Sequence, residues 1–395
     1  MDSTFPNPQS QNPMPNQSPV PMPTQPQGTT PPQPQPPGPT PLPQQPRVGP
    51  IPQPMQTPAA KPQIKFPPLV WENTQSLIKQ LETNLGGKVV TYYVNRGFRM
   101  VDDDVKYFYA HLRKIGHVDK LYFVISSSGG DGKAAFRIAT LLKEYCGELV
   151  IVVPEIAASA ATMLSLAADE LMMTPLAFLT AVDTSIVHPL NPRDERNIPV
   201  SIELEEIKRA IQMLSVEQTN NFEVYKTIFG YIHPAALGAM ERSKNLSEMI
   251  CMDILSLPRK TPYTAEVRKQ IVENLNTQYP SHGYPIPRHK AKELGMNVTY
   301  TQQETNDILW NLINTYRYMT EPARTDLADS LFHTEQVFKV IESVDSRLAL
   351  NNTLERRLDP IIKGWTTLKD EIKWINYFEK EVEGVKKVMM TYLDF

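Results

Sequence analysis

The sequence has little cysteine and little excess charge, and both shortages exclude classes of protein. Its 395 residues include two cysteines, Cys146 and Cys251, which provide neither a disulfide framework nor the four thiolates of a metal site. The formal net charge is −3, which argues against a protein that neutralises many phosphates of a nucleic acid. A basic segment followed by an apolar one is also missing near the N-terminus, so we expect no secretory signal and a cytoplasmic location.

Long apolar runs are scarce as well. The strongest candidate for a membrane span, residues 149–168, carries Pro154 and Glu155 in its middle. The apolar run 149–153 ends at the proline, and small residues follow around Ser159. This pattern predicts a buried strand, a turn and a buried helix rather than a membrane span.

Proline is concentrated at one end of the chain. Residues 1–70 contain 24 of the 37 prolines, and residues 1–64 contain only three charged side chains. Such a segment buries too little apolar surface to offset the entropy lost on ordering. We therefore expect residues 1–65 to form a disordered Pro/Gln-rich tail, suited to docking a protein partner in an extended form.

The rest of the chain divides into two regions. In residues 66–300, apolar segments alternate with amphipathic ones, which predicts an α/β domain whose parallel sheet is covered on both faces. The expected strands are 88–94, 120–125, 149–153 and 171–174, and the expected helices include 71–85, 102–115, 133–145 and a long one over 203–229. Residues 301–395 lack a strand signal and predict a helical extension, with helices at 303–319, 334–350 and 366–392.

Two turns in the α/β region carry residues suited to chemistry. A glycine-rich turn, residues 126–132, joins a predicted strand to a helix and contains Gly129 and Gly130. Ser159 stands among small residues at the next strand–helix junction. Consecutive strand–turn–helix units bring both turns to one edge of a parallel sheet, where a serine nucleophile would face backbone amides that hold an oxyanion. The plainer alternatives are a tight turn that needs glycine and an ordinary N-capping serine.

These segments together resemble a known family. The resemblance is carried by Ser128–Gly130, Ala158–Ala160, Leu166–Met173, Ser281–Ile286 and Ala291–Met296. They are similar to the serine dehydrogenase proteinase family among the ClpP/crotonase-fold serine peptidases, which is related to signal peptide peptidase A. The likeness covers roughly residues 70–300.

The resemblance implies a fold, an assembly and a chemistry. We expect a ClpP/crotonase-like α/β spiral that forms a homo-oligomer and cleaves peptide or protein substrates without a cofactor or metal. Ser159 would be the nucleophile, and Gly129, Gly130 and Ala160 would form the oxyanion hole.

The chain departs from the family pattern in three places, and the general base stays open. Where the family has Ser-Ala-Gly-Thr, residues 159–162 read Ser-Ala-Ala-Thr. Where the family has Gly-Pro-Ile-Asp-Pro, residues 180–184 read Thr-Ala-Val-Asp-Thr. Pro175–Leu176 stand where ClpP has its histidine. The candidate bases are His282, Lys208 and His188, with Asp183 either orienting the base or holding its loop. His282 could equally be a solvated loop residue, and Lys208 part of a solvated helix face.

Three functions are compatible with these residues. The first is a serine peptidase acting through Ser159. The second is a catalytically inactive ClpP-like scaffold or peptide-binding assembly protein, which the altered segments would allow. The third is a coenzyme-A-dependent crotonase-type enzyme, which shares the oxyanion architecture but has no use for a serine at this position.

Overall fold

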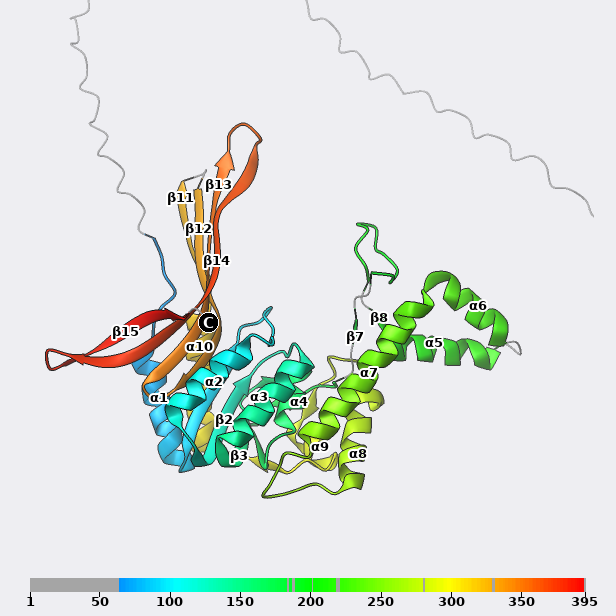
Figure 1. Ribbon diagram of the computed structural model, residues 1–395, viewed down its shortest axis with the longest axis horizontal. Coiled ribbons are helices and arrows are strands. Elements are labelled where there is room, and N and C mark those ends of the chain that lie inside the picture. The colour runs from blue at the N-terminus through cyan, green and yellow to red at the C-terminus, as the bar shows by residue number, and fades with distance from the viewer. Residues whose placement is uncertain are drawn as a thin grey trace, which may run out of the picture. The chain divides into compact units, whose positions relative to one another are not determined.

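The computed structural model describes residues 64–182, 185–186, 189–200, 202–217, 221–279, 281–328 and 331–393. The predicted tail, residues 1–65, lies almost entirely outside these ranges. Within them, ten strands form one sheet in the order β10-β5-β3-β2-β1-β12-β13-β14-β15, with β11 beside β12. The fold is mixed α/β, as predicted (Figure 1).

One half of the sheet is parallel and the other half is antiparallel. The parallel half consists of β1 (Lys88–Val94), β2 (Val118–Ser126), β3 (Cys146–Val153), β5 (Glu170–Met173) and β10 (Val298–Tyr300). The antiparallel half consists of β11 (Ala323–Ala328), β12 (Leu331–Ser343), β13 (Ser346–Asp359), β14 (Gly364–Val382) and β15 (Val385–Leu393). The two halves join where β12 pairs antiparallel with β1.

Helices cover both faces of the parallel half. The helices are α1 (Trp71–Leu85), α2 (Asp104–Ile115), α3 (Gly132–Glu144), α4 (Ala160–Ser165), α5 (Leu204–Glu217), α6 (Asn221–Tyr231), α7 (Pro234–Ile254), α8 (Ala265–Glu273), the π-helix η1 (Asn274–Gln278), α9 (Arg288–Glu293) and α10 (Gln303–Met319). Of these, α5 and α6 pack with the start of α7 in a small cluster of their own rather than on the sheet. The predicted single helix over 203–229 is therefore two helices, α5 and α6. In the described ranges, no helix has both the length and the apolar character needed to cross a membrane.

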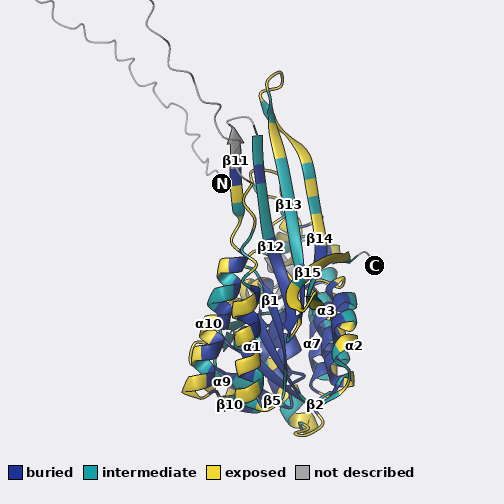
Figure 2. Cartoon of the chain, turned by 90° about the vertical axis from the view of Figure 1, so that its left-hand side faces the viewer, coloured by how far each residue is buried: buried dark blue, intermediate teal, exposed yellow. Residues whose placement is uncertain are grey.

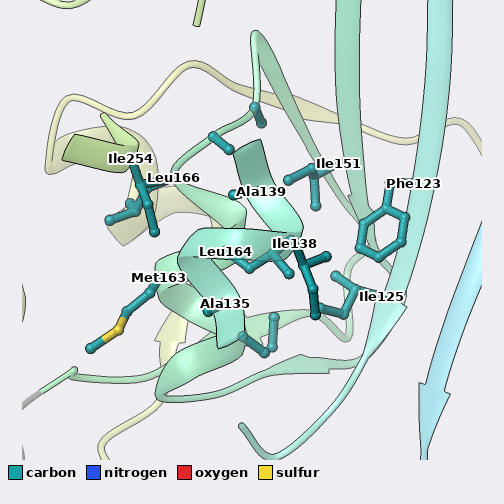
Figure 3. Packing of buried hydrophobic residues seen from close by; sticks show 14 of the residues in the cluster. Phe123, Ile125, Ala135, Ile138, Ala139, Ile151, Met163, Leu164, Leu166 and Ile254 are labelled. Carbon is teal, nitrogen blue, oxygen red and sulfur yellow. The ribbon is translucent and has the colours of Figure 1, made fainter. Parts of the chain in front are cut away.

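The apolar strands bury alternate side chains on opposite faces. Val90, Phe123 and Ile151 lie in the cluster formed with α2, α3, α4 and α7, whereas Val89, Val124 and Val150 lie in the cluster formed with α1 and α10. Figure 2 shows the buried sheet between these two helical layers, and Figure 3 shows how α3 and α4 pack over β2 and β3. Burial on both faces explains why these strands are almost wholly apolar.

A smaller sheet lies at the carboxyl edge of the parallel strands. It consists of β4 (Ile156–Ala157), β6 (Phe178–Leu179) and β9 (Ile286–Pro287), in that order. A separate hairpin pairs β7 (Ser185–Ile186) with β8 (Ile202–Glu203). The three-stranded sheet matters for the site because β4 leads directly into Ser159.

The expectation of a helical extension over 301–395 is wrong after α10. The segments 334–350 and 366–392 form strands β12 to β15 instead of helices. Val337, Phe338, Val340 and Ile341 are all buried, because β12 lies inside the sheet and is covered on both sides. Burial on both faces gives a strand apolar residues at spacings that also fit a helix. The predicted domain boundaries at 65/66 and 300/301 stay a prediction.

A buried carboxylate attaches the antiparallel strands to the helices. Glu342 on β12 is fully buried and accepts hydrogen bonds from Thr74 Oγ1 at 2.7 Å, Gln75 Nε2 at 2.8 Å and Tyr316 OH at 2.9 Å. Arg347 Nη2 on β13 pairs with the same carboxylate at 3.0 Å. This network ties α1, α10, β12 and β13 together around one charge, because a buried ion requires partners on every side.

A second buried carboxylate holds the start of β5. Asp169 forms an ion pair with Lys143 of α3, and both side chains are almost completely buried. The carboxylate also accepts hydrogen bonds from the amides of Leu149 at 2.8 Å, Arg259 at 2.5 Å and Lys260 at 2.8 Å. Burial alone would raise the pKa of Asp169, but these donors outweigh it, so the pKa lies below its usual value.

Removing one partner of the Glu342 network should destabilise the protein strongly. We expect Arg347→Met to lower the free energy of unfolding by about 3–5 kcal/mol, because Glu342 would remain buried without its cation. The matched control is Lys373→Met, which breaks an exposed pair with Glu371 and should cost less than about 1 kcal/mol. Urea unfolding measures both. Equal losses in the two variants would contradict a structural role for the buried pair.

Acid should weaken the fold through His111. This side chain on α2 is fully buried, and neither ring nitrogen has a hydrogen-bond partner among the described residues. Burial, followed by the charges of Lys114 and Lys88, lowers its pKa from 6.5 to about 3. His111 is therefore protonated below pH 6.5 in the unfolded chain, but only below about pH 3 in the folded chain. Stability attributable to His111 should fall across this window by roughly 1.4 kcal/mol per pH unit.

The variant His111→Leu isolates this contribution. Its unfolding free energy should depend less on pH than that of the wild type between pH 6.5 and pH 4, while the two curves run parallel above pH 7. Carboxylates titrate in both proteins, so the difference between the curves is the quantity to measure. Curves that stay parallel throughout would show that His111 makes no such contribution.

Candidate functional site

The turn after β2 requires its two glycines. Gly129 has φ of +98° and Gly130 has φ of +150°. A Cβ atom on Gly130 would lie 2.1 Å from the carbonyl oxygen of Met100, which is closer than atoms can approach. Met100 fixes the turn by donating to the Gly129 carbonyl at 2.8 Å and accepting from the Asp131 amide at 2.9 Å. The glycines are thus needed for both conformation and space.

Ser159 occupies a strained backbone conformation at the start of α4. Its φ is +50° and its ψ is −117°, a region that residues with a side chain rarely adopt. The side chain is half-buried, and within the described residues its Oγ makes no hydrogen bond. Strain held at a residue whose hydroxyl has no structural use is typical of a functional position.

The two turns are in direct contact. A Cβ atom built on Gly129 would lie 2.5 Å from the Ala158 carbonyl oxygen, 2.9 Å from Ser159 Cβ and 3.0 Å from the Ala160 nitrogen. The segment before the serine is fixed to the turn by Ser127, whose carbonyl accepts from the Ala158 amide at 3.0 Å. Only a residue without a side chain at position 129 permits this approach.

Of the three backbone amides predicted to bind the oxyanion, two donate no hydrogen bond to the described residues. The Gly129 amide donates to Ser127 Oγ at 3.1 Å and is therefore used inside the turn. The amides of Gly130 and Ala160 donate no hydrogen bond in the part of the chain that the structure describes. Ala160 is the first residue of α4, where a helix leaves its amide without a partner.

Thr180 holds the Ser159 turn, and sequence reasoning did not find this role. Its Oγ1 accepts a hydrogen bond from the Ser159 amide at 2.9 Å and donates to the Ala181 carbonyl at 3.0 Å. Thr162 Oγ1 in turn accepts from the Thr180 amide at 3.1 Å. The available signal was the departure from the family pattern, because Thr180 stands where the family has glycine.

The extra methyl group of Ala161 lies in the core. Ala161 is fully buried and belongs to the cluster on the α3 side of the sheet. The alanine in the Ser159–Thr162 segment therefore fills the core.

His282 lies in the loop that leads into β9. Antiparallel pairing of β6 with β9 places Leu179 opposite Ile286, so Pro285 is level with Thr180. The loop thus reaches the same end of the small sheet as Ser159. Strand β9 lies two strands from β4, or about 10 Å away. A turn from Ser281 to Tyr284 carries the half-buried His282.

The other predicted bases are placed differently. Lys208 on α5 is exposed and pairs with Glu241 of α7 at 3.9 Å. Helix α7 contacts the segment after Thr180 through Ser247, whose Oγ donates to the Val182 carbonyl. Ser247 lies six residues, or about 9 Å, after Glu241 along α7. Lys208 therefore pairs with α7 about 9 Å along the helix from this contact. Asp183 and His188 lie outside the residues whose side chains the structure describes.

Among the described residues, no group of three or more histidine, cysteine, aspartate or glutamate side chains is arranged to hold a metal ion.

Two curated proteins match part of the chain. Two uncharacterized proteins of Methanocaldococcus jannaschii are 27% and 26% identical over 175 residues, which is 44% of this chain. The matches cover 50% and 52% of those proteins, so the chain spans about half the length of the curated relatives it matches.

Two solved structures give distant matches. A mutant of the membrane-bound stomatin-specific protease 1510-N is 13% identical with a TM-score of 0.32, covering 54% of this chain and 79% of that one. A ClpP1 mutant from Listeria monocytogenes is 14% identical with a TM-score of 0.31, covering 59% and 98%.

The family model that matches is that of the ClpP-like SDH-type serine proteinases, over residues 89–193. This stretch contains Gly129, Gly130, Ser159, Thr180 and Asp183. His282 and Lys208 lie beyond it. The resemblance predicted from the motifs is thus confirmed: residues 89–193 are similar to the ClpP-like SDH-type serine proteinases.

Proposed function

We propose that this chain is a serine peptidase in which Ser159 is the nucleophile. The observation that carries the proposal is the contact between Gly129 and the Ser159–Ala160 segment, with a Cβ on Gly129 only 2.9 Å from Ser159 Cβ. Ser159 is strained, and in the residues that adjoin this contact the amides of Gly130 and Ala160 are unengaged. A nucleophile next to two such donors is the arrangement that acyl transfer needs.

The proposed reaction has two halves. Ser159 Oγ attacks the carbonyl carbon of a peptide bond while His282 takes the hydroxyl proton, and the Gly130 and Ala160 amides hold the oxyanion. The C–N bond then breaks as His282 returns the proton to the leaving amine. Water attacks the acyl-enzyme by the same route and releases the carboxylic acid and free Ser159.

His282 is the preferred base over Lys208. Its loop reaches the end of the small sheet at which Ser159 lies, whereas Lys208 is paired with Glu241 of α7. An imidazole can also accept a proton at neutral pH. Asp183, in the segment that follows Thr180, would orient this imidazole.

The remaining expectations belong to the same proposal. The substrate is a peptide or protein, the working molecule is a homo-oligomer, and the location is cytoplasmic. One observation favours the alternative of an inactive scaffold, namely that Ser159 Oγ has no hydrogen bond to a base within the described residues.

Labelling with a fluorophosphonate tests the nucleophile. The wild-type protein should carry a single adduct, located at Ser159 by peptide mass analysis, and Ser159→Ala should carry none. His282→Ala should slow labelling by at least about 100-fold, since general-base assistance has that size. The control His289→Ala, an exposed histidine seven residues later, should label at the wild-type rate.

Two outcomes would overturn parts of this account. Labelling that survives His282→Ala but disappears in Lys208→Ala would assign the base to the lysine. A folded wild-type protein that never labels would exclude peptidase chemistry at Ser159 and support the scaffold.

Thr180 should act as a positioning residue. Thr180→Val keeps the shape of the side chain but leaves the Ser159 amide without its acceptor, at a cost of about 1–3 kcal/mol. We expect fluorophosphonate labelling to slow at least about tenfold in the folded protein, because the strained turn relaxes. Thr180→Ser, which retains the hydroxyl, should restore the rate. Equal rates in the valine and serine variants would show that the hydroxyl does not position Ser159.

A further inference from the structure

The end of the β13–β14 hairpin exposes apolar side chains. We call residues 358–368 the tip. Ile361 is 88% exposed, Ile362 68%, Trp365 51% and Leu368 50%. Figure 2 shows the exposed tip at the far end of the long strands, away from the helical layers. Hairpin loops are normally polar, so an apolar tip indicates a surface that is covered in the working protein.

The tip is held in one conformation. Asp359 Oδ1 accepts hydrogen bonds from the amides of Ile361 at 2.8 Å and Ile362 at 3.2 Å. Pro360 restricts the preceding backbone, and Lys363 completes the turn with φ of +50°. The two isoleucines are therefore presented in a fixed arrangement, and binding them costs little further ordering.

An apolar cavity lies at the carboxyl edge of the parallel strands. Its volume is about 190 Å³, and its apolar wall includes Pro175, Leu176, Leu309, Trp310 and Ile313. Leu176 is 54% exposed and Trp310 is 53% exposed. A cavity of about 150 Å³ accommodates a benzene-sized group, so this one has room for an isoleucine side chain.

The charges around the two surfaces are complementary. The exposed cations Arg356, Arg357 and Lys363 flank the tip and outnumber its one acid, Asp359. On the rim of the cavity, Arg317 is neutralised by Glu155. Asp307, an exposed acid of the lining, leaves the cavity with one negative charge in excess. Such complementarity favours the encounter of these two surfaces over contact of either with itself.

We propose that the tip of one copy of this chain docks on the cavity lined by Trp310 in a second copy, called here the Trp310 cavity, with Ile361 inserted into it and Ile362 beside it. Both surfaces are exposed in the single chain, so the tip does not fill its own cavity. The contact is head-to-tail, because it joins different surfaces of two identical chains, and such contacts build closed rings or open filaments. The proposal is independent of the chemistry at Ser159.

Light scattering on the purified full chain provides the first test. The wild type should be an oligomer at micromolar concentration. The double variant Ile361→Asp, Ile362→Asp and the variant Trp310→Asp should each associate at least about 100-fold more weakly and run as monomers. The control Tyr231→Asp changes a 78% exposed side chain on α6 and should keep the wild-type mass. Equal far-ultraviolet circular dichroism shows that the variants are folded.

Mixing the two monomeric variants separates a head-to-tail contact from a symmetric one. The Trp310→Asp chain keeps an intact tip and the double variant keeps an intact cavity, so an equimolar mixture should form one-to-one dimers and nothing larger. A mixture that stays monomeric would overturn the proposal. So would a wild-type oligomer that both variants leave unchanged.

Cross-linking offers a test that needs no loss of assembly. The native Cys146 and Cys251 are both buried, so introduced cysteines react selectively. Ile361→Cys mixed with Leu176→Cys should give a disulfide-linked pair on oxidation, and neither variant should cross-link alone. Cross-linking of Ile361→Cys with itself would show that tips pair with tips.

Binding to phospholipid vesicles tests a lipid surface as the alternative occupant. Binding of the wild type, but not the double variant, to such vesicles without cross-linking would show that the tip meets a lipid surface instead. Either result would refute the proposal.

Discussion

The site depends on the close approach of two backbone turns that only glycine allows. Position 129 faces the Ala158 carbonyl oxygen, Ser159 Cβ and the Ala160 nitrogen at distances that no side chain could tolerate. This contact holds the serine next to the edge of the glycine-rich turn, and Thr180 secures it from the opposite side by accepting the Ser159 amide. The strain at Ser159 is therefore supported by neighbours on both sides.

Three buried carboxylates connect the surrounding helices and strands to the sheet that carries the site. Asp169 joins α3, the start of β5 and the segment that begins at Arg259. Glu342 joins the antiparallel strands to α1 and α10. A third carboxylate, Asp104 of α2, accepts from Tyr92 at 2.8 Å and from Lys339 of β12 at 2.8 Å. Each carboxylate takes donors from several elements, because a buried ion is tolerated only when it is fully partnered, and these partners fix the register of the sheet.

Most of the parallel half of the fold was predictable because its signals are local, whereas its short edge strand β10 was not predicted. The strand at 88–94 and the helices at 71–85 and 303–319 agree with β1, α1 and α10 at both ends, since apolar runs and helix-stopping glycines mark them. The region after Met319 was not predictable by the same signals. There, β12 is buried on both faces and β14 is rich in lysine and glutamate, so the pattern and the propensities both resemble those of a helix. The hairpin turn at Glu383–Gly384 was the overlooked sign of strands.

The sequence alone determined which residues are suited to the chemistry: glycines at 129 and 130, and a serine among small residues after an apolar strand. Tertiary structure decided which of their groups are engaged and what lies next to them. The Gly129 amide donates to Ser127 Oγ inside the turn, whereas the amides of Gly130 and Ala160 stay unengaged. The register of β6 and β9 brings the His282 loop to the end of the small sheet at which Ser159 lies. The reason is physical: a residue type limits what a side chain can do, whereas hydrogen-bond partners and distances arise only when segments far apart in sequence pack together.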